Sequence, residues 1–345
     1  MRLVSQEEEL VSAAARGMAA ALQDPYARYY TAEEYEEYLR DLSGEYVGIG
    51  ITITLAASGG AEVVGVNDGG PADKAGVKTG DVLIAVGNED VTTLSLTEIT
   101  DRVLGKEGES VTLTFLRMEQ RLTLDIVREK QVTHQIHHEM MEGNIGYIRI
   151  ERFSGDCEES FRTVLSELKE NGMQALVIDV RGNPGGALET VVAVADLLLP
   201  KGVIVTVKSA DGEEEEYRSD AEGLGLPIAI LVNGSSASAS ELLAGALQDS
   251  GTGIVVGENT YGKGVVQTTW NLPRSGSWFK LTTAAYYTPN GRNIDGEGIA
   301  PDIPVSLPEE WKSVSAASLP REVDTQLSAA LEVLAKELSE SCGIE

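Results

Sequence analysis

The spacing of apolar positions changes along the chain, and each change indicates a different kind of structure. In residues 5–22 apolar side chains recur every three or four positions, which predicts an amphipathic helix. Thr31 and Glu34 have the spacing of a capping box, which predicts a second helix over 32–42. Near the C-terminus, 322–340 again has helical spacing.

The segment between residues 45 and 130 has short alternating runs separated by glycines, which predict a compact β-rich module. The first of these runs, 46–54, reads as one continuous strand. From residue 131 onward, runs of strand length alternate with helical periodicity. Strands are predicted at 145–151, 175–180, 203–208, 227–232 and 253–257, with helices at 156–171, 187–199 and 238–249. This alternation predicts an α/β layer with a mostly parallel sheet.

We therefore expect four regions, and none of them looks like a membrane span. They are an N-terminal helical region (1–44), the β-rich module (45–130), an α/β core (131–310) and a C-terminal helical tail (311–345). No apolar run reaches 18 residues, and the N-terminus has no apolar segment of the signal-peptide kind. The chain is expected either to be cytosolic or to have lost a targeting segment.

Charge and composition narrow the function classes. The formal net charge is −28, which repels phosphate backbones, so a nucleic-acid partner is not expected. Cys157 and Cys342 are far apart and do not suggest a disulfide framework or a zinc site. His134, His137 and His138 lie in one segment without acidic ligand spacing, so no metal is expected there.

A serine-rich turn is the first candidate for chemistry. The predicted strand 227–232 ends in Asn-Gly-Ser-Ser-Ala-Ser-Ala-Ser-Glu (233–241), and an apolar helix follows at once. Ligands of open α/β sheets bind at this edge, and a helix N-terminus there suits an oxyanion. The alternative is structural: Ser238 and Glu241 have capping-box spacing, so Ser238 could be an ordinary N-cap.

Two glycine-rich segments are the other candidates. Lys263 stands between two glycines and before two valines, and burial there would lower its pKa as a general base requires. Gln267, four residues on, would share its side and could hold the amine. The glycines of 182–186 could point backbone N–H groups into a cleft. The alternatives are a surface turn at Lys263 and a plain strand–helix connection at 182–186.

Taken together and in order, these motifs resemble the C-terminal processing peptidases, also called tail-specific proteases. The resemblance covers about residues 10–306. Its motifs are Arg-Gly-Asn-Pro-Gly-Gly (181–186), Ser-Ala-Ser-Ala-Ser-Glu (236–241), Gly-Lys-Gly (262–264) with Gln267, Asp-Pro-Tyr (24–26), Gly-Ile-Gly-Ile (48–51), Thr-Pro-Asn-Gly-Arg (288–292) and Gly-Ile-Ala-Pro-Asp (298–302). It implies a crotonase-like core with a mostly parallel sheet, beside a PDZ domain and terminal helices.

The resemblance also implies a catalytic set. Ser238 would be the nucleophile, Lys263 the base and Gln267 the residue that supports it. Asp249 resembles a family aspartate that matters for the site, and its spacing of three helical turns puts it on the face of Ser238. Its alternative is a carboxylate that ends a helix.

An oxyanion hole is implied as well. The oxyanion would be bound by the N–H of Ala239 and by that of Gly185 or Gly186. The resemblance implies no cofactor and no metal.

The module at 45–130 resembles a PDZ domain, whose carboxylate-binding loop would be Gly48, Ile49, Gly50 and Ile51. Partners would be proteins or peptides with free C-termini, although 48–51 could also be an ordinary strand. Family members suggest a bacterial cell envelope setting and a possible homodimer through terminal helices. The rival functions are a non-catalytic ligand-binding protein on the same fold and a crotonase-like acyl-CoA enzyme.

Overall fold

The computed structural model describes residues 2–56, 58–132, 135–220, 222–312 and 314–342, and the chain divides into two compact units. One unit comprises residues 43–133 and the other the remainder. His134 and the side chain of Cys342 lie outside the described residues, so the expectations for them are not addressed.

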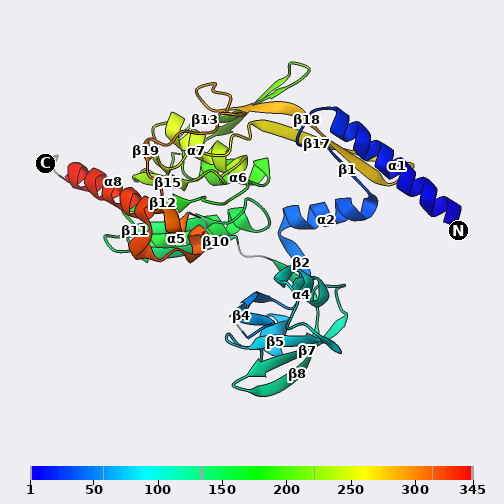
Figure 1. The fold of residues 1–345 in the computed structure, drawn as a ribbon. Coiled ribbons are helices and arrows are strands. Elements are labelled where there is room, and N and C mark those ends of the chain that lie inside the picture. Colours follow the sequence, from blue (N-terminus) through cyan, green and yellow to red (C-terminus); the bar gives the residue numbers. More distant parts are fainter. Residues whose placement is uncertain (1, 57, 133–134, 221, 313, 343–345) are drawn as a thin grey trace. The chain divides into compact units, whose positions relative to one another are not determined.

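A six-stranded sheet forms the centre of the larger unit (Figure 1). Its order is β10 (Ile136–Met141), β11 (Ile145–Ile150), β12 (Ala175–Asp179), β15 (Ile228–Val232), β16 (Gly253–Gly257) and β19 (Ile303–Pro304). The β10–β11 pair is antiparallel, and the other pairs are parallel. Every residue of β12 and β15 is buried, as expected for parallel strands covered on both faces.

Helices cover the two faces of this sheet, and successive strand residues face them alternately. Ile178 and Ile230 share one core with α5 (Cys157–Glu170), α6 (Leu188–Asp196) and α7 (Ala239–Asp249). Val177 and Leu231 share the other core with α8 (Thr325–Cys342). The helices predicted at 156–171, 187–199, 238–249 and 322–340 are all present within a few residues.

The second sheet of this unit is entirely antiparallel. It runs β1 (Arg28–Tyr30), β18 (Ser277–Tyr287), β13 (Gly202–Ser209) and β14 (Glu214–Ser219), with β17 (Val265–Leu272) paired to β18. The sequence predicted only β13 of these strands. The expectation of a mostly parallel sheet therefore applies to the first sheet alone, and the fold is a mixed α/β one.

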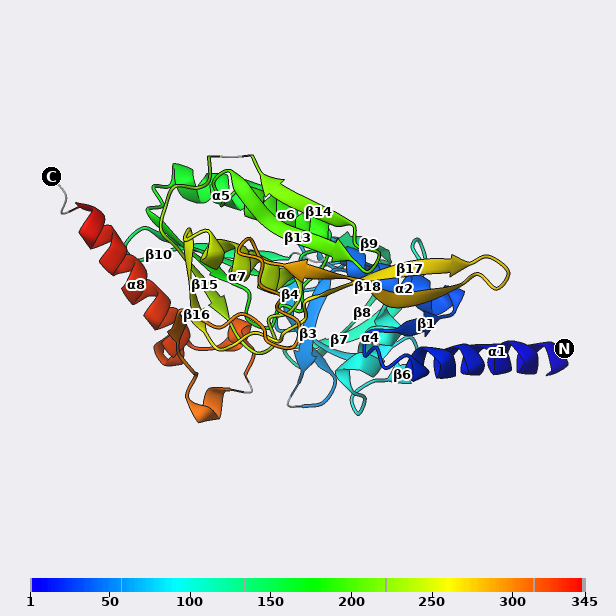
Figure 2. The same cartoon turned by 90° about the horizontal axis from the view of Figure 1, so that it is seen from above.

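The N-terminal helices α1 (Arg2–Ala21) and α2 (Ala32–Ser43) precede and follow β1. The Tyr35 ring of α2 stacks on Trp278 of β18 with centroids 3.9 Å apart, which joins the N-terminal segment to the antiparallel sheet. Figures 1 and 2 show α1 and α8 at opposite ends of the larger unit. Among the described residues, no helix is both long enough and apolar enough to cross a membrane.

The C-terminal helix is fastened to the parallel sheet by a buried ion-pair network. The Arg181 guanidinium, 1% exposed, donates to both carboxylate oxygens of Asp324 at 2.8 Å and to those of Asp179. It also donates to Gln326 Oε1 at 3.0 Å. Three short 3₁₀ helices precede α8: η1 (Glu309–Trp311), η2 (Ala316–Ser318) and η3 (Arg321–Val323). Arg181 thus links α8 directly to the glycine loop that follows β12.

The smaller unit is a β-rich fold with two helices. Its sheet runs β3 (Ile51–Leu55), β4 (Ala61–Val66), β5 (Val82–Val86), β7 (Ser110–Arg117) and β8 (Gln120–Val127), with β6 (Glu89–Asp90) on β5. β2 (Glu45–Gly48) pairs with β9 (Glu129–Val132), and the helices are α3 (Pro71–Lys74) and α4 (Leu96–Val103). The prediction of one continuous strand over 46–54 is wrong, because Gly50 has φ +74° and divides this segment into β2 and β3.

Candidate active site

The candidate nucleophile turn, residues 233–238, joins β15 to α7, and the three alternate serines of 236–240 have different contacts. The Ser236 hydroxyl donates to the Val180 carbonyl at 2.8 Å, and that of Ser240 donates to the Asn183 carbonyl at 2.9 Å. Both therefore bind the turn to the neighbouring glycine loop. No hydrogen bond joins Ser238 Oγ to that loop among the described residues. The middle serine is thus the one whose hydroxyl does not bind the turn to the glycine loop.

The Ser238 backbone is strained. Its φ of +56° with ψ −113° lies in a region that side-chain-bearing residues seldom adopt. A nucleophile on a sharp strand-to-helix turn has this kind of geometry, which exposes its hydroxyl above the sheet. Ser238 does occupy the N-cap position of α7, as the structural alternative supposed, but with an unusual backbone for a cap.

The glycine loop after β12 packs directly against Ser238. A Cβ added to Gly185 would lie 2.9 Å from Ser238 Cβ and 3.0 Å from the Ala239 nitrogen. Only glycine allows this approach at φ +106°. The loop is fixed by Asn183, whose Oδ1 accepts the Gly185 N–H at 2.8 Å and whose Nδ2 donates to the Ile150 carbonyl at 2.9 Å.

This arrangement distinguishes between the two glycines whose N–H groups were expected to bind the oxyanion. The Gly185 N–H is already used by Asn183, so it is a poor candidate. Within the described chain, the N–H groups of Ala239 and Gly186 have no acceptor. Gly186 is held in place because Phe153 pairs with it in an isolated parallel bridge. Ala239 and Gly186 are therefore the candidates that remain for an oxyanion hole.

Lys263 lies in the loop between β16 and β17, where its flanking glycines allow close packing. A Cβ on Gly264 would lie 2.4 Å from the Asp295 nitrogen, so a side chain cannot be placed there. Burial lowers the pKa of Lys263, nearby Lys280 lowers it further, and the Glu241 charge acts in the opposite direction. The net lowering favours the neutral amine that a general base needs.

One carboxylate connects the nucleophile turn with the lysine loop. Glu241 Oε2 accepts the N–H of Ser238 at 2.8 Å and that of Lys263 at 2.9 Å. The two backbone nitrogens can therefore be no farther apart than the sum of these distances. The structure thus brings together the serine turn, the lysine loop and, through Gly185, the glycine loop.

The Lys263 amine itself faces an aromatic ring. Its Nζ lies 4.9 Å from the centroid of the Tyr26 ring, a cation–π geometry. No hydrogen bond joins Nζ to Ser238 Oγ in the described structure. Tyr26 follows Asp24, whose carboxylate accepts the Thr282 N–H at 2.9 Å and so holds this segment on β18.

Two predicted site residues are not brought to this centre. The Gln267 amide donates to the Val265 carbonyl at 3.3 Å, beside a bulge in β17, and makes no hydrogen bond to Lys263 in the described chain. Asp249 is the last residue of α7, about 16 Å along the helix from Ser238 at 1.5 Å per residue. Its carboxylate accepts the Asn290 N–H and pairs with Arg292, which matches the helix-end alternative.

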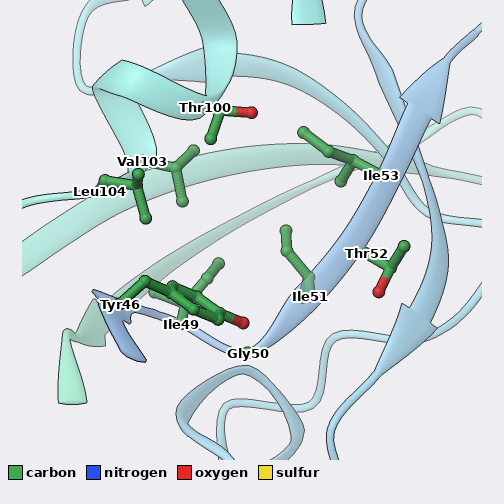
Figure 3. Close-up of a pocket in the computed structure, with 9 residues that line it drawn as sticks. All are labelled: Tyr46, Ile49, Gly50, Ile51, Thr52, Ile53, Thr100, Val103 and Leu104. Carbon is green, nitrogen blue, oxygen red and sulfur yellow. The ribbon is translucent and has the colours of Figure 1, made fainter. Parts of the chain in front are cut away.

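A second candidate site is a groove in the smaller unit, between β3 and α4 (Figure 3). It has a volume of about 350 Å³ and a largely apolar lining: Tyr46, Ile49, Gly50, Ile51, Thr52, Ile53, Thr100, Val103 and Leu104. Ile51 and Ile53 point toward Thr100 and Val103, whereas Thr52 points away. Gly48 does not line the groove, but a Cβ there would meet the Tyr46 and Leu104 side chains at 3.0 and 3.1 Å.

The histidines and the described cysteine lie elsewhere. His137 and His138 are on β10, near Glu151 and Glu167, and no set of three potential metal ligands occurs in the part of the chain that is described. Burial raises the pKa of the Cys157 thiol to about 12, so this cysteine is not a nucleophile near neutral pH.

Three residues of the site were missed as such by sequence reasoning. Glu241 was predicted only as a partner in a helix cap and as the last residue of a motif, and Asn183 and Tyr26 only as parts of motifs. A signal for Glu241 existed, because the residues that follow it, 242–247, carry no polar side chain, and a helix without a polar face is typical of a buried position.

A strained serine beside unpaired backbone N–H groups and a desolvated lysine are features of a serine hydrolase, here combined with a peptide-sized groove in a separate unit. Sequence profiles agree with this class: that of peptidase family S41 matches residues 144–305, and that of the PDZ domain matches residues 62–117.

Two curated relatives extend the match. A carboxy-terminal-processing protease of Bartonella bacilliformis is 35% identical over 325 residues, covering 90% of this chain and 73% of the relative. A probable CtpA-like serine protease of Staphylococcus aureus is 35% identical over 306 residues, covering 88% of this chain. The chain spans only 61% of that second relative. This chain belongs to peptidase family S41.

Solved structures agree. A photosystem II D1 C-terminal processing protease is 31% identical with a TM-score of 0.54, covering 85% of this chain and 82% of that one. A putative S41 protease of Bacteroides fragilis, 16% identical with a TM-score of 0.59, covers 92% of this chain and 87% of that one, and supports the fold alone. The predicted resemblance to C-terminal processing peptidases, with serine-protease function and a PDZ domain, is confirmed.

Proposed function

We propose that this chain is a serine endopeptidase in which Ser238 attacks the peptide carbonyl and Lys263 is the general base. The observation that supports this most directly is the shared acceptor, Glu241 Oε2, which keeps the two catalytic segments adjacent. Neutral Lys263 takes the Ser238 proton, and the Oγ–carbon bond forms. The N–H groups of Ala239 and Gly186 bind the oxyanion.

In the second half of the reaction, the Lys263 ammonium gives its proton to the leaving amine as the peptide bond breaks. Neutral Lys263 then takes a proton from water, and the hydroxide attacks the acyl carbon. The Lys263 ammonium returns this proton to Ser238 Oγ as the acyl–oxygen bond breaks. The Tyr26 ring attracts the ammonium form of Lys263 but not the neutral amine. Deprotonation therefore weakens this contact and frees Nζ to approach the serine. Gln267 keeps its proposed supporting role only if its amide turns from Val265 toward Lys263.

The substrate is proposed to be a protein or peptide whose free C-terminus enters the groove beside β3. The apolar lining favours an apolar last side chain, and Ile49, Gly50 and Ile51 lie where an added strand would meet the sheet edge. In such a domain the terminal carboxylate is held by backbone N–H groups. The module at 45–130 would thus select substrates for the core.

The finer architecture and setting are also proposals. The parallel sheet covered by α5, α6 and α7 supports a crotonase-like core, which an experimental structure would test by superposition. Exposed apolar residues on α1, Leu10 and Met18 among them, support a homodimer through terminal helices, testable by light scattering. The bacterial relatives support a cell-envelope setting, testable by fractionation.

Cleavage of a disordered substrate with an apolar free C-terminus tests the activity. Ser238→Ala and Lys263→Ala are each expected to abolish cleavage, with the cuts of the wild-type enzyme mapped by mass spectrometry. Ser235→Ala and Lys201→Ala are matched controls, since both residues are exposed. Near-wild-type turnover by either catalytic variant would refute the mechanism. Peptide binding without any cleavage by the wild type would favour the alternative, a non-catalytic binding protein on this fold.

A further inference from the structure

Glu241 is a fully buried carboxylate without a basic partner at hydrogen-bonding distance among the described residues. It is 0% exposed and lies in the first turn of α7. A buried charge is costly unless its oxygens are satisfied. The structure satisfies them with four donors, so the carboxylate has a full set of contacts although no salt bridge neutralises it.

The four donors come from both halves of the proposed catalytic site. Oε2 accepts the backbone N–H groups of Ser238 and Lys263, at 2.8 and 2.9 Å. Oε1 accepts the Gly262 N–H at 2.7 Å and the Thr260 hydroxyl at 2.6 Å. Every contact is a donor to one of the two carboxylate oxygens, and an acceptor-only carboxylate suits such a set. Hydrogen bonds to a charged acceptor are stronger than neutral ones.

The extent of this network exceeds what a helix cap needs. An ordinary capping glutamate binds the N–H of its own N-cap residue. Glu98 of α4 does this, since its carboxylate accepts the N–H and the hydroxyl of Ser95, the N-cap of its own helix. Glu241 keeps the same local bond to Ser238 and adds three donors from residues 260–263.

We propose that Glu241 is a positioning residue for the serine–lysine pair. It sets the register between the nucleophile turn and the lysine loop. The inference rests on the proposed function of Ser238 and Lys263. Glu241 itself does not reach the substrate in this role. It fixes the backbone on either side, so that the base and the nucleophile start each turnover at a constant separation.

Its charge has a second effect, on the base. The Glu241 carboxylate favours the protonated form of Lys263 and so raises the pKa of the amine, against the lowering by burial and by Lys280. Removing this charge is therefore expected to lower the pKa of Lys263 further. A purely structural residue would not change the pH dependence of the reaction in this direction.

Glu241→Gln and Glu241→Asp separate the two effects. Glutamine keeps the shape but replaces one acceptor oxygen with an NH₂ group that cannot accept. We expect kcat/KM to fall about 100-fold, as for a 1 Å misplacement, and the acidic limb of its pH profile to move to lower pH. Aspartate keeps the charge but is one methylene shorter, so we expect a similar fall with the acidic limb unmoved.

The matched control is Glu98→Gln, which alters a capping glutamate of the same spacing and should leave rate and pH profile unchanged. Folding of each variant is checked by circular dichroism and by binding of a C-terminal peptide. If Glu241→Gln does not fold, Thr260→Val decides, since it removes one donor at nearly constant shape and should lower kcat severalfold. Wild-type kcat in that variant would overturn the proposal.

The proposal is also overturned if folded Glu241→Gln has the wild-type rate, or if it loses activity without any shift of the acidic limb. These failures are distinct from failure of the proposed function. If Ser238→Ala or Lys263→Ala still cleaves, the catalytic assignment is wrong whatever Glu241 does. If both are inactive while Glu241→Gln is normal, only the positioning role is wrong.

Discussion

Gly185→Ala tests whether the glycine loop and the nucleophile turn form one site. An added Cβ would lie 2.8 Å from the Ala237 carbonyl oxygen and 2.9 Å from Ser238 Cβ, whereas ordinary contact begins at 3.4 Å. The atoms that it meets are backbone or are attached directly to it, so they cannot rotate away. One of the two segments must therefore move by about half an ångström or more, which displaces Ser238 and the Ala239 N–H together.

The expected loss of activity follows from the displacement of Ser238 and of the Ala239 N–H. A misplacement of about 1 Å can cost 100-fold in rate, and loss of one oxyanion donor costs about 100- to 1,000-fold. We expect kcat/KM for Gly185→Ala to fall at least 100-fold, or about 2.7 kcal/mol of transition-state stabilisation. The assay is cleavage of a disordered substrate with an apolar C-terminus, in parallel with urea unfolding.

Gly182→Ala is the matched control. Gly182 lies in the same loop at φ +77°, but a Cβ added there would meet nothing within 4 Å. Both variants therefore carry the left-handed backbone cost of about 1–2 kcal/mol, and only one carries the clash. We expect Gly182→Ala to lose stability but to keep kcat/KM within threefold. Equal activity in the two variants, high or low, would contradict the contact argument.

The remaining predictions concern the base, the groove, the C-terminal helix and Asp249. The acidic limb of kcat/KM should lie below the ordinary lysine pKa, because burial lowers that of Lys263 and the neutral amine is the active form; a limb at the ordinary value would contradict this, and Lys263→Arg should be inactive at every accessible pH. Ile51→Ser should raise KM about tenfold for free C-termini, from roughly 1.5 kcal/mol of lost apolar contact, and should not affect C-terminally amidated substrates. Asp324→Asn should lower the free energy of unfolding by about 3 kcal/mol in urea titrations, because the buried Arg181 guanidinium then loses the negative charge and one of the two acceptor oxygens of Asp324. Asp249→Asn should destabilise the protein but keep kcat/KM within threefold; a 100-fold loss would restore the catalytic role implied by resemblance.

The parts of the fold that were predicted from sequence are those with unambiguous local patterns. The strands that became β12 and β15 are continuous apolar runs, and α5, α7 and α8 have clear helical spacing. The hairpin of β17 and β18 was missed because its residues are mostly half-buried or exposed, so the alternation that marks a strand is weak. Its pairing with β13 and β1 is long-range and has no local signal.

The same limit explains the outcome at the site. The sequence predicted Ser238, Lys263 and the glycine loop as site residues, because each lies in a short motif and the motifs occur in a fixed order. Asp249 shares a helical face with Ser238 by periodicity, but a shared face says nothing about distance along the helix. Which of Gly185 and Gly186 can donate depends on the Asn183 side chain, and no spacing rule gives that contact.

The capping spacing of Ser238 and Glu241 shows why a structural and a functional interpretation need not compete. The sequence offered them as alternatives: either the pair began a helix, or the serine was a nucleophile. In the structure, the same glutamate that binds the Ser238 N–H also binds the Lys263 and Gly262 N–H groups. A cap is normally satisfied by local contacts alone. Here the Glu241 carboxylate also accepts donors from a loop about twenty residues away. The same capping contact that favoured a structural role for Ser238 therefore also holds the Lys263 loop beside it.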